Sequence, residues 1–277
     1  MPTALNGRRY LEYEKAIDLV ELFAAGQIKP PADYFYSHAK RYVATLCSIP
    51  FAEGPGKSAI EFGASHLFQW ALKTVFGYEH VHGTYFGGDA GRAFDQMVEA
   101  PDYYKPHKGF FINLEDDVMP IADETYDFGL CCEVIEHMDC DPMFFLAEVN
   151  RITKTGGTLL MTTPNSTSAR NIIKILRGRA PHQFMSYTRD RDRYRHNIEY
   201  DVHQVGVLGQ AAGFDIEGLR TLDTWAETPP EVIEFLRKNG FPTEARGDNT
   251  FFFGRKAGPV RDRYPGEGIY VGEGSHA

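Results

Sequence analysis

Residues 127–165 decide the fold, and they read DFGLCCEVIEHMDCDPMFFLAEVNRITKTGGTLLMTTPN. Residues 127–132 form a short apolar run, which predicts a buried strand. Apolar side chains then recur at helical spacing over residues 144–152, and Thr-Gly-Gly at residues 155–157 ends that helix. Residues 158–163 predict the next strand. Two strands joined by a helix and a tight turn form a βαβ unit, so the sequence predicts an α/β fold.

Polar side chains follow the first of these strands directly. Glu133, Glu136 and His137 come at its carboxyl end, where ligands of open α/β sheets bind. Their i, i+3, i+4 spacing brings the three side chains to one side of a helical turn. Carboxylate oxygens and imidazole nitrogens suit Mg²⁺, Mn²⁺ or a related ion. The sequence therefore predicts a functional site at this strand end.

This segment resembles the class I S-adenosylmethionine (SAM) dependent methyltransferases. They commonly read F-D-x-x-x-x-x-E-V-x-E-H, then x-E-x-x-R-x-L-K-P-G-G, and then a strand that leads into T-P-N. The matching residues here are Tyr126-Asp127, residues 133–137, Glu148 with Arg151, residues 154–157 and residues 163–165. The resemblance implies a Rossmann-like α/β fold, with a seven-stranded class I methyltransferase sheet that has helices on both faces.

The chain divides into three parts around this motif. Residues 1–56 carry two helical patterns and form an N-terminal helical extension, which either covers the substrate side as a lid or packs on the sheet. Residues 57–256 match the methyltransferase domain, with an insertion at residues 166–200. Residues 257–277 form a C-terminal tail that is rich in glycine and looks irregular.

The loop after the first predicted strand, residues 58–62, stands in the place of the family's D/E-x-G-x-G motif. It reads Glu-Phe-Gly-Ala-Ser at residues 61–65, and Gly63 is the one glycine that remains. At the end of the second predicted strand, Tyr85 stands where the family usually has the acid that binds the ribose hydroxyls. The resemblance implies a SAM site formed by Glu61, Gly63, Ala64, Ser65, Tyr85, Asn113, Leu114, Glu115, Cys132 and Glu133.

A later histidine completes the pattern around the first motif. His196 lies in Arg-His-Asn-Ile-Glu-Tyr, residues 195–200. The combination is similar to that of RNA 3′-end ribose 2′-O-methyltransferases, which bind a metal with Glu-x-x-Glu-His and a later His. It is also similar to methyltransferases of polysaccharide biosynthesis, which share the sequence motifs CCEVIEH and RHNxEY. The resemblance implies that the candidate metal ligands are Glu133, Glu136, His137 and His196.

The same residues allow two readings of the chemistry. Without a metal, His137 or His196 would act as the general base, with Glu136 as a further catalytic residue. Glu-His at this position also occurs in relatives that bind no metal, where the histidine lines the pocket, so a positioning role stays open.

The insertion is basic within an acidic chain. Residues 166–200 hold eight Lys or Arg and three Asp or Glu, a net charge of +5 inside a chain of −9. Such a run is often only a solvated face, but beside an active site it could hold a phosphate or carboxylate of the acceptor. The acidity of the whole chain disfavours nonspecific nucleic-acid binding.

Length and composition set the remaining expectations. The 277 residues suit one α/β domain with insertions, no apolar run approaches a membrane span, and the N-terminus lacks the apolar core of a signal peptide. We therefore expect a cytoplasmic protein, and self-association into a homo-oligomer stays open. The four cysteines lack metal-type spacing.

The sequence predicts an O-methyltransferase that uses SAM, with or without Mg²⁺ or Mn²⁺. The expected acceptor is a small-molecule or glycan hydroxyl, most simply a sugar or glycan precursor, which could be anionic. The alternatives are methylation of a phenol- or quinone-type metabolite, methylation of an RNA 3′-terminal ribose, and a non-catalytic scaffold with a methyltransferase fold. Tyr85 and the single loop glycine keep the last alternative open.

Overall fold

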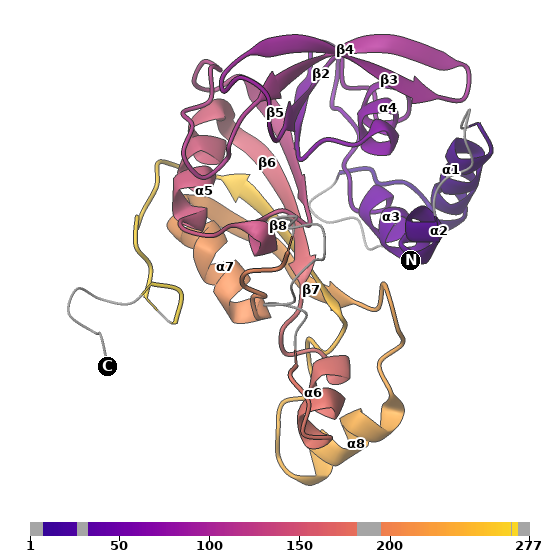
Figure 1. The fold of residues 1–277 in the computed structure, drawn as a ribbon, viewed down its shortest axis with the longest axis vertical. Coiled ribbons are helices and arrows are strands. Elements are labelled where there is room, and N and C mark those ends of the chain that lie inside the picture. Colours follow the sequence, from indigo (N-terminus) through magenta and orange to yellow (C-terminus); the bar gives the residue numbers. More distant parts are fainter. Residues whose placement is uncertain (1–7, 27–32, 182–194, 267, 271–277) are drawn as a thin grey trace.

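A computed structural model describes residues 8–26, 33–181, 195–266 and 268–270. Eight strands form one twisted sheet in the order β3-β4-β2-β1-β5-β6-β8-β7 (Figure 1). The strands are β1 Ser58–Phe62, β2 His80–Tyr85, β3 Ala93–Ala100, β4 Tyr103–Phe111, β5 Tyr126–Cys132, β6 Thr153–Pro164, β7 Phe214–Leu222 and β8 Asn249–Lys256.

The centre of the sheet is parallel and its two edges are antiparallel. β4, β2, β1, β5 and β6 pair in parallel, whereas β3 runs antiparallel to β4, and β8 runs antiparallel to both β6 and β7. Every residue of β1 is buried, as expected for a parallel strand that is covered on both faces. The carboxyl ends of β1, β2, β4 and β5 therefore meet at one edge of the sheet.

Helices cover both faces of the sheet (Figure 1). They are α1 Tyr13–Ala25, α2 Asp33–Ser37, α3 Ala39–Leu46, α4 His66–Thr74, α5 Pro142–Ile152, α6 Ala169–Leu176, α7 Val202–Ala211 and α8 Pro230–Lys238. Side chains of α5 and α7 pack in one core cluster, and side chains of α1, α3 and α4 pack in a second cluster. Neighbouring residues of β6 alternate between them, since Leu159 and Met161 belong to the first and Leu160 to the second.

The helix starts agree with their sequences. Asp141 caps α5 by accepting a hydrogen bond from the Phe144 amide, and Pro142 occupies the first helical turn. Asp201 and Gln204 form a reciprocal capping box at the start of α7. These local signals fix the helices that follow β5 and precede β7.

The expected number of seven strands is wrong, because β3 adds an eighth. β3 and β4 form a hairpin whose connection contains Asp102 with a φ of 53°. Its outer half is partly exposed and carries polar residues such as Lys105, so it lacks the buried apolar pattern by which central strands are recognised. The N-terminal extension is small, and its helices α1 and α3 share a core with α4.

The insertion contains an element that the sequence did not indicate. Helix α6 packs against α8 through Ala169, Val232 and Leu236, and the two helices form a small lobe beyond one end of the sheet (Figure 1). The predicted basic residues Arg189, Arg191 and Arg193 lie outside the described residues.

Candidate active site

A cavity of about 470 Å³ opens at the carboxyl ends of β1, β2, β4 and β5. Its size is within the range of about 300–1,000 Å³ that is usual for ligand sites. The residues that line it are Gly63, Thr84, Phe86, Ile112, Asn113, Leu114, Glu115, Asp116, Cys132, Glu133, Val134, His137, Met138, Asp139 and Cys140. This is the position at which open α/β sheets bind their ligands.

Six of the predicted cofactor residues line this cavity, namely Gly63, Asn113, Leu114, Glu115, Cys132 and Glu133. Gly63 has a φ of 68°, and a Cβ atom there would lie 3.0 Å from Val134 Cγ2. The left-handed backbone and the close approach both favour glycine at this loop position. The first strand–loop unit therefore keeps the one glycine that its geometry requires.

Glu61 is buried beneath the loop and does not line the cavity. Its carboxylate accepts hydrogen bonds from the amide and hydroxyl of Ser65, at 2.9 and 3.0 Å, and from Gln69 Nε2 at 3.0 Å. Burial raises the pKa of Glu61 to about 8. These bonds join β1 to the start of α4, and Ala64 and Ser65 likewise lie outside the cavity lining.

Tyr85 does not line the cavity either. Its ring packs against Phe94 at a centroid distance of 5.3 Å, while Thr84 and Phe86 line the cavity instead. Successive side chains of a strand point to opposite faces, so Tyr85 and its two neighbours are separated by the sheet. The sequence analysis missed Thr84 and Phe86, although this alternation could have found them.

Glu133 has a full set of partners. Its Oε1 accepts hydrogen bonds from Thr162 Oγ1 at 2.8 Å and Asn249 Nδ2 at 2.9 Å, and its Oε2 lies 2.8 Å from Arg41 Nη1. The φ of Glu133 is 56°, which is rare for a residue with a side chain. Glu133 does not belong to the group of ligand atoms that the structure brings together, and its role as a metal ligand stays a prediction. Nothing in the sequence pattern pointed to Arg41 or Asn249.

The other three predicted ligands come together. Glu136, His137 and His196 each offer a ligand atom, and these atoms all lie within 4.8 Å of one another. Glu136 and His137 belong to a short 3₁₀ turn, Ile135–His137, directly after β5. His196 comes from the far end of the insertion. We call these three residues the Glu-His-His cluster.

Glu136 is fully buried and lacks a partner for one oxygen. Its Oε2 accepts a hydrogen bond from Thr163 Oγ1 at 3.0 Å, but its Oε1 has no hydrogen-bond partner among the described residues. Burial, and then the nearby charge of Glu133, raise the pKa of Glu136 well above its usual value. A buried polar oxygen without a partner is costly for folding and commonly marks a functional group.

The two histidines are oriented by hydrogen bonds at Nδ1. His137 Nδ1 lies 3.1 Å from the carbonyl oxygen of Arg195, which can only accept, so the proton of the neutral ring is on Nδ1. Its free Nε2 lies 4.0 Å from Glu136 Oε1. His196 Nδ1 is held in the same way by Glu199 Oε1 at 2.8 Å. Burial and the neighbouring His196 lower the pKa of His137, which keeps its ring neutral at neutral pH.

A second cavity, of about 170 Å³, adjoins the cluster from the other side. Its lining residues are Pro164, Asn165, Ser168, Arg170, Asn171, Lys174, His196, Glu199, Trp225 and Asp248. His137 lines the first cavity and His196 lines the second, and their ring centroids are 5.0 Å apart. The cluster therefore lies between two cavities.

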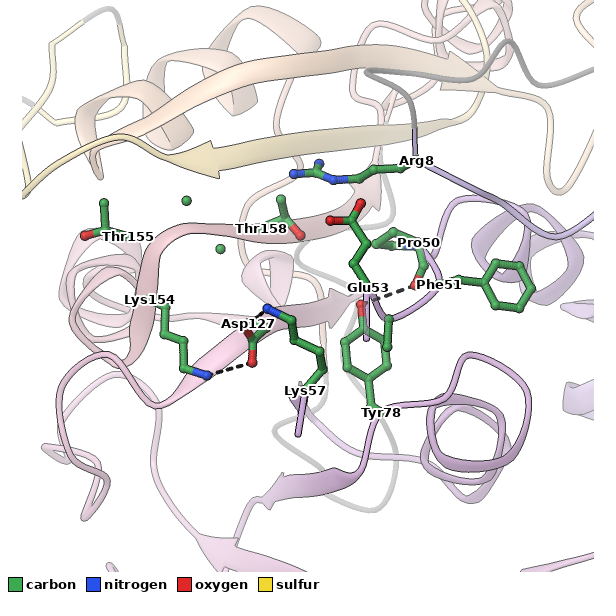
Figure 2. Close-up of a pocket in the computed structure, with 13 residues that line it drawn as sticks. Arg8, Pro50, Phe51, Glu53, Lys57, Tyr78, Asp127, Lys154, Thr155 and Thr158 are labelled. Carbon is green, nitrogen blue, oxygen red and sulfur yellow. Dashed lines mark hydrogen bonds and ion pairs between the residues drawn. The ribbon is translucent and has the colours of Figure 1, made fainter. Parts of the chain in front are cut away.

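A third cavity, of about 330 Å³, opens at the opposite edge of the sheet (Figure 2). Asp127, near the start of β5, accepts hydrogen bonds there from Lys57 and Lys154, each at 2.8 Å, and from the Ser58 amide at 3.0 Å. Gly156 and Gly157 line the same cavity. Asp127, Lys57 and Lys154 are thus paired with one another, which is the arrangement of a structural ion network.

None of the helices in the described ranges combines the length and apolar character that a transmembrane segment needs.

Comparison with known families of proteins gives one match. A family model described as a methyltransferase domain matches residues 39–219. No curated protein matches the chain significantly.

Among solved structures, a SAM-dependent methyltransferase from Archaeoglobus fulgidus has 13% identity and a TM-score of 0.48, covering 82% of this chain and 95% of that chain. One from Methanosarcina mazei has 14% identity and a TM-score of 0.48, covering 74% and 94%. One from Mesorhizobium loti has 14% identity and a TM-score of 0.47, covering 78% and 97%.

Proposed function

Since the family model spans more than half of the chain, the protein belongs to the methyltransferase-domain family, and we propose that it transfers a methyl group from SAM to a hydroxyl. The acceptor class that we propose is a sugar or glycan precursor. The observation that carries this proposal is the position of the Glu-His-His cluster between two cavities. One cavity would hold the methyl donor, and the other would hold the acceptor.

The larger cavity suits the methyl donor by its place in the fold. Gly63 lets the backbone of the loop after β1 approach a ligand closely, and Asn113, Leu114 and Glu115 line the wall after β4. Thr84 and Phe86 take the place that the sequence comparison had given to Tyr85. We propose that this wall binds the nucleoside part of SAM.

The cluster suits a divalent metal by the chemistry of its donor atoms. Glu136 Oε1 lacks a partner, and the Nδ1 bonds of His137 and His196 leave both Nε2 atoms as acceptors. Glu199 holds Nδ1 of His196, as carboxylates beside metal sites typically orient a metal-binding histidine. A bound Mg²⁺ or Mn²⁺ would act as a Lewis acid that lowers the pKa of the acceptor hydroxyl.

The same residues allow base catalysis without a metal. The Nε2 lone pair of neutral His137 faces the cluster and could accept the hydroxyl proton as the methyl group is transferred. The carboxylate of Glu136 would then stabilise the imidazolium that forms. Both variants assign activation of the hydroxyl to side chains of the Glu-His-His cluster.

The first test is calorimetric titration of SAM and S-adenosylhomocysteine into the full chain, with and without Mn²⁺. We expect binding of both nucleosides, and methyl transfer from labelled SAM to hydroxyls of a sugar panel. His137→Ala and His196→Ala should abolish transfer while nucleoside binding persists. His80→Ala, at the opposite end of β2, is the matched control and should retain activity. Absence of nucleoside binding would favour a non-catalytic scaffold.

The cytoplasmic location and any homo-oligomer stay predictions. The charge of −9 also keeps RNA a weaker acceptor candidate than a sugar.

A further inference from the structure

The smaller cavity has the chemistry of an anion-binding subsite. We propose that the acceptor carries a carboxylate or phosphate group close to the methylated hydroxyl, and that Arg170 and Lys174 bind this group. The inference rests on the proposed function for the identity of the acceptor. The anion site itself rests on the charges, partners and shape of the cavity.

Two cations of α6 face this cavity together. Arg170 and Lys174 are four residues apart, so they lie on one face of the helix, and both line the cavity. Lys174 Nζ donates a hydrogen bond to the carbonyl oxygen of Pro181 at 3.1 Å, and neither side chain has an ion-pair partner within the described ranges. Two adjacent cations that form no ion pair with the carboxylates of the described residues favour an external anion.

The carboxylates that line the cavity are already engaged. Asp248 accepts hydrogen bonds from the amides of Thr224, Trp225 and Ala226 and from the hydroxyl of Thr224, all within 3.0 Å. Glu199 holds His196. Glu199 also attracts Lys174 electrostatically, and the neighbouring charge of Arg170 opposes this effect. The bonds of Asp248 keep its carboxylate on the backbone amides of residues 224–226, so it does not neutralise the two cations.

An aromatic surface lies beside the cations. Trp225 lines the cavity, and 38% of its surface is exposed. The edge-to-face contact with His38, at a centroid distance of 4.0 Å, orients the indole. An exposed aromatic ring offers an apolar surface for the C–H face of a sugar, while the neighbouring cations bind an acidic substituent. The lining thus suits an acidic sugar better than a neutral one.

The position of the cavity connects this subsite to the reaction. His196 belongs to the Glu-His-His cluster and also lines the cavity. The volume of about 170 Å³ is below the usual range of about 300–1,000 Å³ for ligand sites. The cavity therefore suits a single charged sugar unit of a larger acceptor. The hydroxyl of that acceptor would lie at the cluster, and its anionic group would lie at α6.

The test measures binding of three sugars to the full chain by calorimetry: glucose 1-phosphate, glucuronate and glucose. We expect at least one anionic sugar to bind about tenfold more tightly than glucose, and the better one tells phosphate from carboxylate. Arg170→Gln and Lys174→Gln should each weaken that binding about tenfold. Arg177→Gln is the matched control, because it removes an equal charge from the end of α6 outside the cavity lining, and it should leave affinity within about twofold.

Four results would overturn the subsite. They are equal binding of all three sugars, equal loss in the Arg177→Gln variant, binding only of a short RNA oligonucleotide, and no detectable binding of all three sugars. SAM binding is measured separately, so loss of the proposed methyltransferase function can be told from loss of the anion subsite.

Discussion

Two acidic side chains at opposite ends of β5, Asp127 and Glu136, differ in how many hydrogen-bond partners they have. Asp127 near the start of β5 accepts hydrogen bonds from two lysines and from the amide and hydroxyl of Ser58. Glu136, four residues beyond the end of the same strand, has one oxygen bonded to Thr163 and one oxygen without a described partner. The carboxylate of Asp127 at the amino edge of the sheet therefore has hydrogen-bond partners for both oxygens, and that of Glu136 at the carboxyl edge has a described partner for only one.

The pKa values of these two acids follow this difference. Partial burial opposes ionisation of Asp127, but the hydrogen bonds from Lys154 and Lys57 outweigh it and lower its pKa to about 2. Burial and the charge of Glu133 instead raise the pKa of Glu136. A completed network stabilises the fold, whereas an incomplete one costs stability and leaves atoms available for a ligand. We therefore expect the cavity at the carboxyl edge to bind a ligand, and the charged residues at the amino edge to stabilise the fold.

The largest expected effect is on activity at the carboxyl edge. Glu136→Gln should lower the rate of methyl transfer by about 100- to 10,000-fold, the usual contribution of a catalytic acid or base. Its melting temperature should stay equal or rise, because the substitution removes a buried ionisable group that lacks a full set of partners. Transfer of labelled methyl groups and thermal unfolding measure the two effects. A marked loss of stability with normal activity per folded molecule would reverse the comparison.

Metal addition should act on the carboxyl edge alone. If the Glu-His-His cluster binds Mn²⁺, a metal concentration 100 times the dissociation constant should stabilise the protein by about 2.7 kcal/mol. Thermal unfolding with Mn²⁺ and with a chelator measures this shift. The shift should vanish in His196→Ala and persist in Asp127→Asn. No shift in the unmodified chain would leave base catalysis by histidine as the mechanism.

Loss of the amino-edge carboxylate should affect stability instead. Asp127→Asn should reduce the free energy of unfolding by about 2 kcal/mol, because Lys57 and Lys154 lose their shared partner. Both lysine side chains are more than a third exposed, which limits the effect through solvent screening. Denaturant unfolding gives the loss. Methyl transfer per folded molecule should be unchanged, and a matching loss of activity would contradict a purely structural role.

The smallest expected effect is the loss, at low pH, of the stabilisation that Asp127 contributes to the folded chain. Asp127 has a pKa of about 2 in the folded chain and an ordinary value of 3.8, so its contribution to stability is present above pH 4. It is lost as the pH falls from about 4 to 2, by roughly 1–2 kcal/mol. Unfolding of the unmodified chain and of Asp127→Asn across this range measures it. A stability difference that stays constant with pH would show that charge is not its cause.

The central part of the fold could be predicted from sequence. β1 and β5 lie where the sequence predicted strands, and β2 ends at Tyr85 as predicted. For β5 the signal was an apolar run, which a parallel strand covered on both faces needs. A strand was expected over residues 109–114 and overlaps the inner end of β4, but β3 and the outer half of β4 escaped prediction. That outer half is stabilised by pairing rather than by burial. Helix α6 escaped because its apolar face packs on α8, about 60 residues away in the chain.

The candidate site was predicted only in part. The motif after β5 placed Glu136 and His137 together, since three or four residues of separation ensure proximity in a helical turn. It also included Glu133, whose carboxylate contacts Arg41 and Asn249. Spacing along the chain says nothing of these two partners. These partners come from α3 and β8, at opposite ends of the chain.

By itself, the sequence determined the order of elements and the local groups at the end of β5, because both depend on periodicity and spacing between near neighbours. Only the tertiary structure decided which distant side chains complete each group. It placed His196 beside His137, separated Tyr85 from the larger cavity, and brought Trp225 to the cations of α6. The physical reason is that packing of helices on a sheet joins residues that no local pattern relates.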